Sequence, residues 1–205
     1  VDSGPLHHES WKWMAEEARG NFSRELFKET FGMEGLEITK KILGADVGKQ
    51  TLRKWYDRKE KKFREMARDE LELLNGARKL LRDLRGEGFK VGLGTSSPKE
   101  NARFMLNLFN IRDMFDAIVA AEDVKQGKPN PEIYVKAGSK LNLSPKQCVV
   151  IEDAPVGIKA GKRAGMKVIA LTTTHPKEKL SDADLVVAGF NDLNAEKMKQ
   201  WMQSS

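Results

Sequence analysis

The amino-acid sequence predicts an α/β protein in which a doubly wound parallel sheet, covered by helices on both faces, is joined to a smaller helical domain. Two patterns support this fold class. From about residue 74 onward, short apolar strand patterns alternate with helical ones, as the crossovers of a parallel sheet require. Over the first third of the chain, apolar residues instead recur every three or four positions, with almost no strand signal.

The first third is predicted to be a small helical bundle. Several stretches have the helical spacing of apolar residues, and the last of them forms a long amphipathic pattern. The residues that carry these patterns are Trp11, Met14 and Ala18; Phe22, Leu26 and Phe27; Leu36, Ile38, Ile42 and Leu43; and Leu52, Trp55, Tyr56, Phe63 and Met66. Gly32, Gly44 and Gly48 separate the pieces.

A change in composition near Asn75 and Gly76 marks the start of the sheet-forming part. A helical pattern follows and ends near Gly86. Five strands are then predicted, over residues 89–95, 117–120, 149–151, 167–171 and 185–187. Since ligands of such sheets bind beyond the carboxyl ends of the strands, polar residues at those ends are the candidates for a functional site.

The composition is that of a globular protein, with 205 residues of which 40% are hydrophobic and 32% charged. No apolar run reaches the length of a membrane span and no stretch has the order of a signal peptide, so we expect no membrane partner. The single cysteine, Cys148, lies in an apolar run and has no partner for an internal disulfide. It is expected to be a core residue in a reducing compartment, which indicates a cytoplasmic protein.

The net charge of +6 favours anionic partners in general. The densest basic stretch, residues 58–65, mixes both signs and is interpreted as the solvated face of a helix rather than a polyanion site. Because no recognisable nucleic-acid-binding module surrounds it, we expect a small phosphorylated metabolite as partner and not a nucleic acid.

Three hydroxyl residues, Thr95, Ser96 and Ser97, end the first predicted strand and precede a helix. Hydroxyls and backbone N–H groups at a helix N-terminus favour a bound phosphate. The alternative is that a serine simply caps the helix.

Two adjacent carboxylates, Glu152 and Asp153, follow the apolar strand at residues 149–151. The two carboxylates repel each other at a buried strand end unless a cation is near. A hard divalent ion such as Mg²⁺ would offset this repulsion. The alternative is that Asp153 caps the next helix while Glu152 points to water.

Lys128 lies between Gly127 and Pro129 on a loop that two prolines stiffen. An ammonium group fixed in this way can neutralise a phosphoryl group during transfer. Most loop lysines have no such role, so the argument for Lys128 depends on the other two segments.

Together these segments closely resemble the haloacid dehalogenase superfamily, in particular its β-phosphoglucomutase-like phosphatases. Residues 91–97 resemble the family's second motif, Lys128 in residues 127–132 the third, and residues 149–158 the fourth, continued by Ala160, Ala164 and Gly165. Order and spacing agree over nearly the whole chain. The resemblance implies a Rossmann-like core over residues 74–205, an inserted cap domain over residues 5–73, and the end of the first catalytic motif at residues 1–4.

Residues 1–11 resemble the tail of that first motif. By this pattern a nucleophilic aspartate lies about six residues before Val1 and an acid/base aspartate two residues after the nucleophile. We therefore expect an upstream segment that carries both and forms a central strand. Without it, two neighbouring strands would have unpaired backbone groups.

The resemblance implies an enzyme, a phosphatase that cleaves a small phosphate monoester through an aspartyl-phosphate intermediate, with Mg²⁺ held by the nucleophilic aspartate, Asp153 and Glu152. Thr95 and Lys128 then contact the phosphoryl group, with Ser96 and Ser97 beside it. His7 resembles a hinge-proximal histidine of the family, although a surface role is at least as compatible with its position. The cap is expected to close over the substrate and exclude water.

Two other functions are compatible with the sequence. Mutase relatives carry a basic residue in the cap loop that corresponds to residues 32–37, and this loop has none, which favours a phosphatase over β-phosphoglucomutase-type transfer. Lys40 or Lys41 is a possible substitute. A non-catalytic phosphate-binding or partner-binding protein is the second alternative, should the mature chain begin at Val1. We expect a monomer or a weak oligomer.

Overall fold

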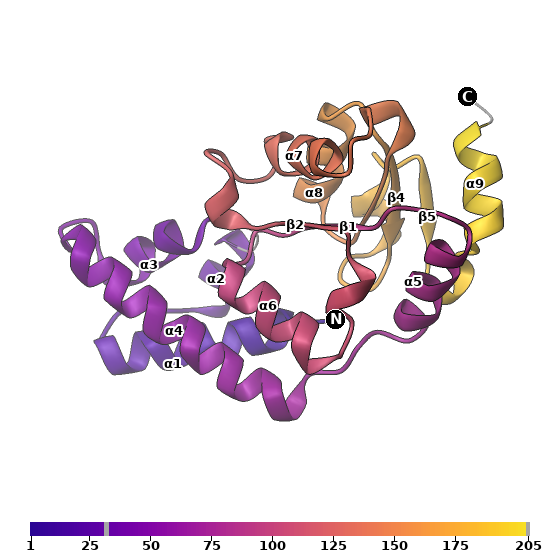
Figure 1. Ribbon diagram of the computed structural model, residues 1–205. Helices are drawn as coiled ribbons and strands as arrows, with labels where there is room; N and C mark the ends of the chain where they lie inside the picture. The colour runs from indigo at the N-terminus through magenta and orange to yellow at the C-terminus, as the bar shows by residue number, and fades with distance from the viewer. Residues whose placement is uncertain (31–32, 204–205) are drawn as a thin grey trace. The chain divides into compact units, whose positions relative to one another are not determined.

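The computed structural model describes residues 1–30 and 33–203, so that Gly32, expected to separate two helices, lies outside the described residues. The chain divides into two compact units, Val1–Glu72 and Leu73–Ser205, which are described separately (Figure 1). Among the described helices, none combines the length and the apolar character needed to cross a membrane.

The first unit consists of four helices: α1 (Gly4–Ala18), α2 (Arg24–Thr30), α3 (Gly35–Leu43) and α4 (Lys49–Glu70). Helices α1 and α3 both pack against α4. Their apolar positions, spaced three or four residues apart, meet in one core of Trp11, Met14, Ala15, Ile38, Ile42 and Tyr56. The predicted helical patterns are therefore found as helices, except that Phe22 lies before the start of α2, and α4 is longer at both ends than its apolar residues indicated.

The second unit alternates helices and strands in the predicted order. Its elements are α5 (Ala77–Gly86), β1 (Gly92–Gly94), α6 (Lys99–Leu108), β2 (Ala117–Val119), α7 (Glu132–Lys140), β3 (Val149–Glu152), α8 (Pro155–Arg163), β4 (Lys167–Leu171), β5 (Leu185–Val187) and α9 (Ala195–Gln203), with short 3₁₀ turns between some of them. All five predicted strands are present. The first is shorter than the predicted 89–95, because the N–H of Phe89 closes the end of α5 by bonding to the carbonyl of Leu84 at 2.9 Å.

Both faces of the sheet are covered, as a doubly wound fold requires. Alternate residues of β3 and β4 belong to different cores. Val150, Val168 and Ala170 pack with α7 and α8, whereas Val149, Ile151 and Ile169 pack with α5 and α9. Figure 1 shows α7 and α8 together on one side of the strands and α5 beside α9. Cys148 is half-buried and packs against the first of these cores.

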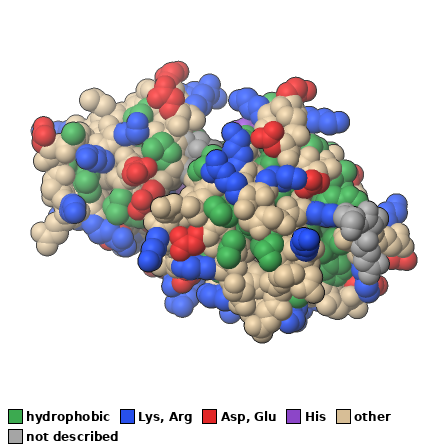
Figure 2. Space-filling model, turned by 90° about the horizontal axis from the view of Figure 1, so that it is seen from above, with side chains coloured by type: hydrophobic (Ala, Val, Ile, Leu, Met, Phe, Trp, Pro, Cys, Tyr) green, Lys and Arg blue, Asp and Glu red, His purple; other side chains and the backbone are tan. Residues whose placement is uncertain are grey.

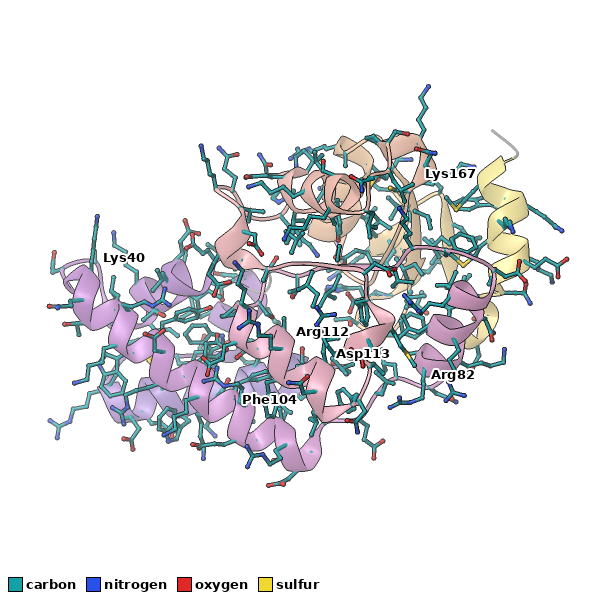
Figure 3. All side chains as sticks on the ribbon, in the orientation of Figure 1. Lys40, Arg82, Phe104, Arg112, Asp113 and Lys167 are labelled. Atoms are coloured by element: carbon teal, nitrogen blue, oxygen red, sulfur yellow. The ribbon has the colours of Figure 1, made fainter. Side chains whose placement is uncertain are left out.

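Helix α9 is attached to the sheet by Lys167, at the start of β4 (Figure 3). The Nζ atom of Lys167 donates a hydrogen bond of 2.6 Å to the carbonyl of Trp201 and lies 4.5 Å from the centre of its indole ring. Burial of the ring and the cation–π contact together hold the end of the chain against the core.

The strands form two parallel sheets rather than one continuous sheet. In one, β1 pairs with β2 in the register Gly92 to Ala117, and in the other the order is β3-β4-β5, with Val149 opposite Lys167 and Ile169 opposite Leu185. A cavity of about 670 Å³ lies at the break, and its lining includes Gly92–Gly94 of β1 and Val149–Glu152 of β3. Within the described residues, no strand pairs with the edges of β1 and β3 that border this cavity.

Charge is distributed in both signs over the surface. On the face drawn in Figure 2, acidic side chains are interspersed among the basic ones. Several of them form ion pairs, such as Lys79 with Asp83 at 2.5 Å and Lys162 with Asp184 at 2.5 Å. The net positive charge is thus spread over many sites.

Candidate active site

Lys128 brings the ends of β1 and β3 together. Its loop precedes α7, and its Nζ atom lies 3.5 Å from the carbonyl oxygen of Gly94, the last residue of β1. The same ammonium forms an ion pair with Glu152, the last residue of β3. The side chains of Lys128 and Glu152 are only 10% and 9% exposed. Three segments that are far apart in the sequence therefore meet beside the cavity.

The carboxylate of Glu152 is held by four donors. Its Oε1 accepts hydrogen bonds from Lys128 and from the hydroxyl of Tyr134 at 2.6 Å, and its Oε2 accepts from the backbone N–H groups of Asp153 at 3.0 Å and Ala154 at 3.2 Å. Burial alone would raise the pKa of Glu152, but the Lys128 charge and these hydrogen bonds outweigh it and lower the pKa. Glu152 is therefore ionised at neutral pH, and the alternative in which it points to water is wrong.

Gly157 makes room for this carboxylate. A Cβ atom at position 157, in the first turn of α8, would stand 2.1 Å from the Cδ atom of Glu152, much closer than any non-bonded contact allows. Tyr134 also contacts the ion pair. Its ring lies 4.9 Å from the Lys128 Nζ atom, and a Cβ on Gly94 would meet it at 3.2 Å.

Asp153 is in a different environment from its neighbour. Its Oδ2 accepts a hydrogen bond from the hydroxyl of Thr174, on the loop after β4. Burial, and then the charge of Glu152, raise the pKa of Asp153, although Thr174 opposes the shift. Asp153 does not cap α8: the N-cap position is Ala154, and no side chain makes the cap hydrogen bond. This alternative is therefore wrong.

The two carboxylates suit a hard divalent cation. They are adjacent, partly buried and oxygen-based, which is the ligand type that such ions prefer. Within residues 1–30 and 33–203, no group of three acidic, histidine or cysteine side chains forms a metal site, so Glu152 and Asp153 supply two ligands at most. Further oxygen ligands would have to come from water, substrate or another segment.

The three hydroxyl residues Thr95, Ser96 and Ser97 lie directly after β1. The N–H of Thr95 bonds to the carbonyl of Val119 at 3.0 Å, which extends the pairing with β2, and the Thr95 hydroxyl accepts from the N–H of Ser97 at 3.1 Å. Neither serine caps α6. Pro98 occupies the N-cap position, and the N–H of Lys99 bonds to the carboxylate of Glu122 at 2.9 Å, so the serine-cap alternative is also wrong. Ser96 is exposed and Ser97 half-buried.

His7 lies in the first unit, on α1, against two residues of α4. Its Nδ1 is 2.9 Å from the Nζ of Lys59, and its ring stacks on Phe63 with 4.0 Å between the ring centres. Burial, reinforced by the Lys59 charge, lowers the pKa of His7 well below its ordinary value. His7 is thus half-buried, with Lys59 and Phe63 as its partners within the first unit.

The interpretation of residues 58–65 as a solvated face is wrong for two of them. Lys59 is 1% exposed and Glu60 5% exposed, and their side chains form an ion pair of 3.0 Å. The Lys59 ammonium also lies 4.5 Å from the centre of the Trp11 ring. Burial lowers the pKa of Lys59, while Glu60 acts in the opposite direction. Sequence reasoning did not identify Lys59, Tyr134, Gly157 or Thr174 as parts of these clusters.

Known proteins resemble the chain over most of its length. The model of the haloacid dehalogenase-like hydrolase family matches residues 1–171. A β-phosphoglucomutase of Bacillus subtilis (strain 168) is 34% identical over 211 aligned positions, which cover 99% of this chain and 91% of that protein. A validoxylamine A 7'-phosphate phosphatase of Streptomyces hygroscopicus subsp. limoneus is 40% identical over 120 positions, covering 58% of this chain and 56% of that protein.

A solved structure agrees with these relatives. The crystal structure of a β-phosphoglucomutase from Clostridium difficile superposes with a TM-score of 0.88 at 27% identity, and the match covers 99% of this chain and 92% of that one. The motif order, the fold and the relatives lead to one assignment: the chain belongs to the haloacid dehalogenase-like hydrolase family, within its β-phosphoglucomutase-like branch.

Proposed function

We propose that this protein is a Mg²⁺-dependent phosphatase that hydrolyses a small phosphate monoester, such as a sugar phosphate, through an aspartyl-phosphate intermediate. One observation carries the proposal: a nearly buried lysine joins the hydroxyl-bearing end of β1 to the carboxylate-bearing end of β3. A phosphoryl group placed there would find a cation, hydroxyl groups and backbone N–H donors within one small region.

Each residue then has a specific task. Thr95 would donate a hydrogen bond to a phosphoryl oxygen, with Ser96 and Ser97 adjacent, and Lys128 would offset the negative charge of the group. Asp153 and Glu152 would hold Mg²⁺, which when bound supplies further positive charge to the phosphoryl oxygens. Because Glu152 keeps Lys128 in place through their ion pair, removing Glu152 would disturb both tasks.

The nucleophile is proposed to be an aspartate on a strand outside residues 1–205. The cavity between β1 and β3 supports this placement, because both strands that line it have an edge without a strand partner among the described residues. A parallel strand in this position would end between Thr95 and Asp153, so that an aspartate at its carboxyl end would face the phosphoryl group. A second aspartate, two residues later, would protonate the leaving alcohol and then activate water.

The first unit is proposed to act as the cap that selects the leaving group. His7 is its candidate substrate contact, now with Lys59 as a hydrogen-bonding partner. Both side chains are held by aromatic rings of the same unit, which fixes their geometry before any substrate binds. Closure of this cap over the substrate would exclude bulk water.

A mutase that transfers the phosphoryl group within a sugar phosphate is the second candidate, favoured by the 34% identity to the Bacillus mutase over nearly its whole length. Against it, residues 32–37 contain no lysine or arginine to bind a second phosphate. The next basic residues, Lys40 and Lys41, are exposed on α3, and Figure 3 labels Lys40 there.

The test is an assay of the full gene product for phosphate release from a panel of sugar monophosphates, with and without Mg²⁺. A coupled mutase assay with a sugar bisphosphate as activator is run in parallel. Metal-dependent release supports the phosphatase, and the ranking of substrates identifies the leaving group. Isomerisation of the sugar phosphate without net phosphate release would replace the phosphatase proposal by the mutase. The absence of both activities would favour a binding protein.

A further inference from the structure

Thr174 belongs to a loop that none of the family motifs includes. The loop begins after β4, the strand next to β3, where Glu152 is opposite Ala170. Thr172 continues the strand pairing through a 3.0 Å hydrogen bond from its N–H to the carbonyl of Val187. Two residues later, the Thr174 hydroxyl reaches back to β3 and donates to Oδ2 of Asp153.

The neighbouring carboxylates differ in what surrounds them. Glu152 accepts four hydrogen bonds, one of them from the cationic Lys128. For Asp153, Thr174 is the one side chain within the described part of the chain that donates a hydrogen bond. A neutral hydroxyl fixes the orientation of a carboxylate but does not neutralise its charge. Asp153 is therefore oriented and still in need of a cation.

We propose that Thr174 is a positioning residue: its hydroxyl holds Oδ2 of Asp153, so that the other carboxylate oxygen is presented to Mg²⁺ in a fixed direction. This inference rests on the proposed function, since it takes Asp153 as a ligand of the metal. Hydrogen bonds to the ligands of a metal orient those ligands, and their loss weakens metal affinity by roughly 10- to 100-fold.

The experiment compares three variants of the full gene product. Thr174→Val removes the hydroxyl and keeps the shape, and Thr174→Ser retains a donor. Thr173→Val is the matched control, because no described residue forms a hydrogen bond with the Thr173 hydroxyl. The dissociation constant of Mg²⁺ is measured by isothermal titration calorimetry without substrate. The Mg²⁺ concentration that gives half-maximal phosphate release is measured separately.

Thr174→Val is expected to raise the Mg²⁺ dissociation constant by about 10- to 100-fold, and Thr174→Ser and Thr173→Val by less than about threefold. Saturating Mg²⁺ should restore most of kcat in Thr174→Val. A merely structural role would lower the melting temperature and kcat without changing Mg²⁺ affinity. Should Thr174→Val fail to fold, Thr174→Ala, which adds no atoms, decides the question.

The outcomes separate this inference from the proposed function. A wild-type protein that binds Mg²⁺ and releases phosphate, combined with an unchanged affinity in Thr174→Val, overturns the role of Thr174 alone. If Thr174→Val weakens Mg²⁺ affinity but the wild-type protein releases phosphate from no substrate, the positioning role of Thr174 is supported and the phosphatase proposal is overturned. A wild-type protein that binds no Mg²⁺ overturns both.

Discussion

Lys128, on the loop before α7, forms an ion pair with Glu152 at the end of β3, and their side chains are 10% and 9% exposed. The pair is enclosed by the Tyr134 ring and supported by two backbone N–H groups. A buried ion pair is rarely kept for stability alone, because desolvation of both charges offsets much of their attraction. Its position between the ends of β1 and β3 supports the proposed role of Lys128 in binding a phosphoryl group.

Glu152→Gln leaves the Lys128 ammonium buried without its counter-charge. We expect a loss of about 3 kcal/mol in the free energy of unfolding and nearly complete loss of phosphatase activity. Urea denaturation followed by circular dichroism measures the first effect. Lys79→Met is the control, because the ion pair of Lys79 with Asp83 is exposed and its loss should change stability by less than about 0.5 kcal/mol. Equal effects of the two substitutions would contradict the burial argument.

Gly157→Ala tests the space beside Glu152. Replacing a glycine inside a helix by alanine usually stabilises a protein by up to about 1 kcal/mol. Here the new Cβ would meet the Glu152 carboxylate at 2.1 Å, so we expect lower stability and lower activity. Gly86→Ala, at the end of α5, is matched to it because its Cβ would enter open space. If both variants gain stability, the described contact of Gly157 is incorrect.

Tyr134→Phe removes one hydroxyl and leaves the ring in place. The hydroxyl donates to the ionised Glu152 at 2.6 Å, and hydrogen bonds to charged groups contribute about 1.5–3 kcal/mol. We expect a destabilisation in this range and reduced kcat, measured by urea denaturation and phosphate release. An unchanged free energy of unfolding would show that the hydroxyl makes no net contribution.

The fold was predictable because it depends on patterns that extend over many residues. The apolar runs of β3 and β4, whose alternate side chains enter opposite cores, and the helical spacing in α1 and α4 are both direct consequences of backbone geometry. The break between β1 and β3 was expected only from the family resemblance. Nothing in the periodicity of either strand indicates that its neighbour lies elsewhere, because pairing partners are set by tertiary structure.

The candidate site was predicted in part. Lys128, Glu152 and Asp153 carry charge at strand ends or loops, which makes them visible in a sequence. Lys59 had a usable signal, since it lies three residues after Tyr56 and four before Phe63 and so shares their buried face. Gly157 was detectable as a glycine inside a helix. No sequence pattern pointed to Thr174, because its contact with Asp153 depends on how two loops meet in space.

His7 makes the stability of the first unit sensitive to acid. Its pKa in the folded protein lies well below the ordinary 6.5, so between these two values the unfolded chain binds a proton that the folded chain does not. Stability is therefore fully present above about pH 6.5 and decreases as the pH falls, by at most about 1.4 kcal/mol per pH unit. Unfolding between pH 7 and 5 can be followed by tryptophan fluorescence, since Trp11, Trp13 and Trp55 all lie in this unit.

The control for this prediction is the adjacent histidine. His7→Gln is expected to flatten the decrease between pH 7 and 5, even though it loses the stacking on Phe63. His8→Gln makes the same substitution one residue away and leaves the contacts of His7 with Lys59 and Phe63 in place, so the slope that His7 causes should persist in it. If the pH dependence of stability disappears in His8→Gln and persists in His7→Gln, it belongs to His8, and the prediction for His7 is contradicted.

The most direct test of the central claim is Mg²⁺-dependent phosphate release by the full gene product, compared with that of its Asp153→Ala variant. Release is measured from the best substrate of the sugar phosphate panel, with saturating Mg²⁺ and again with excess chelator. We expect release that requires the metal and that falls at least about 100-fold in Asp153→Ala. Release that persists with the chelator, or that Asp153→Ala leaves unchanged, would contradict it.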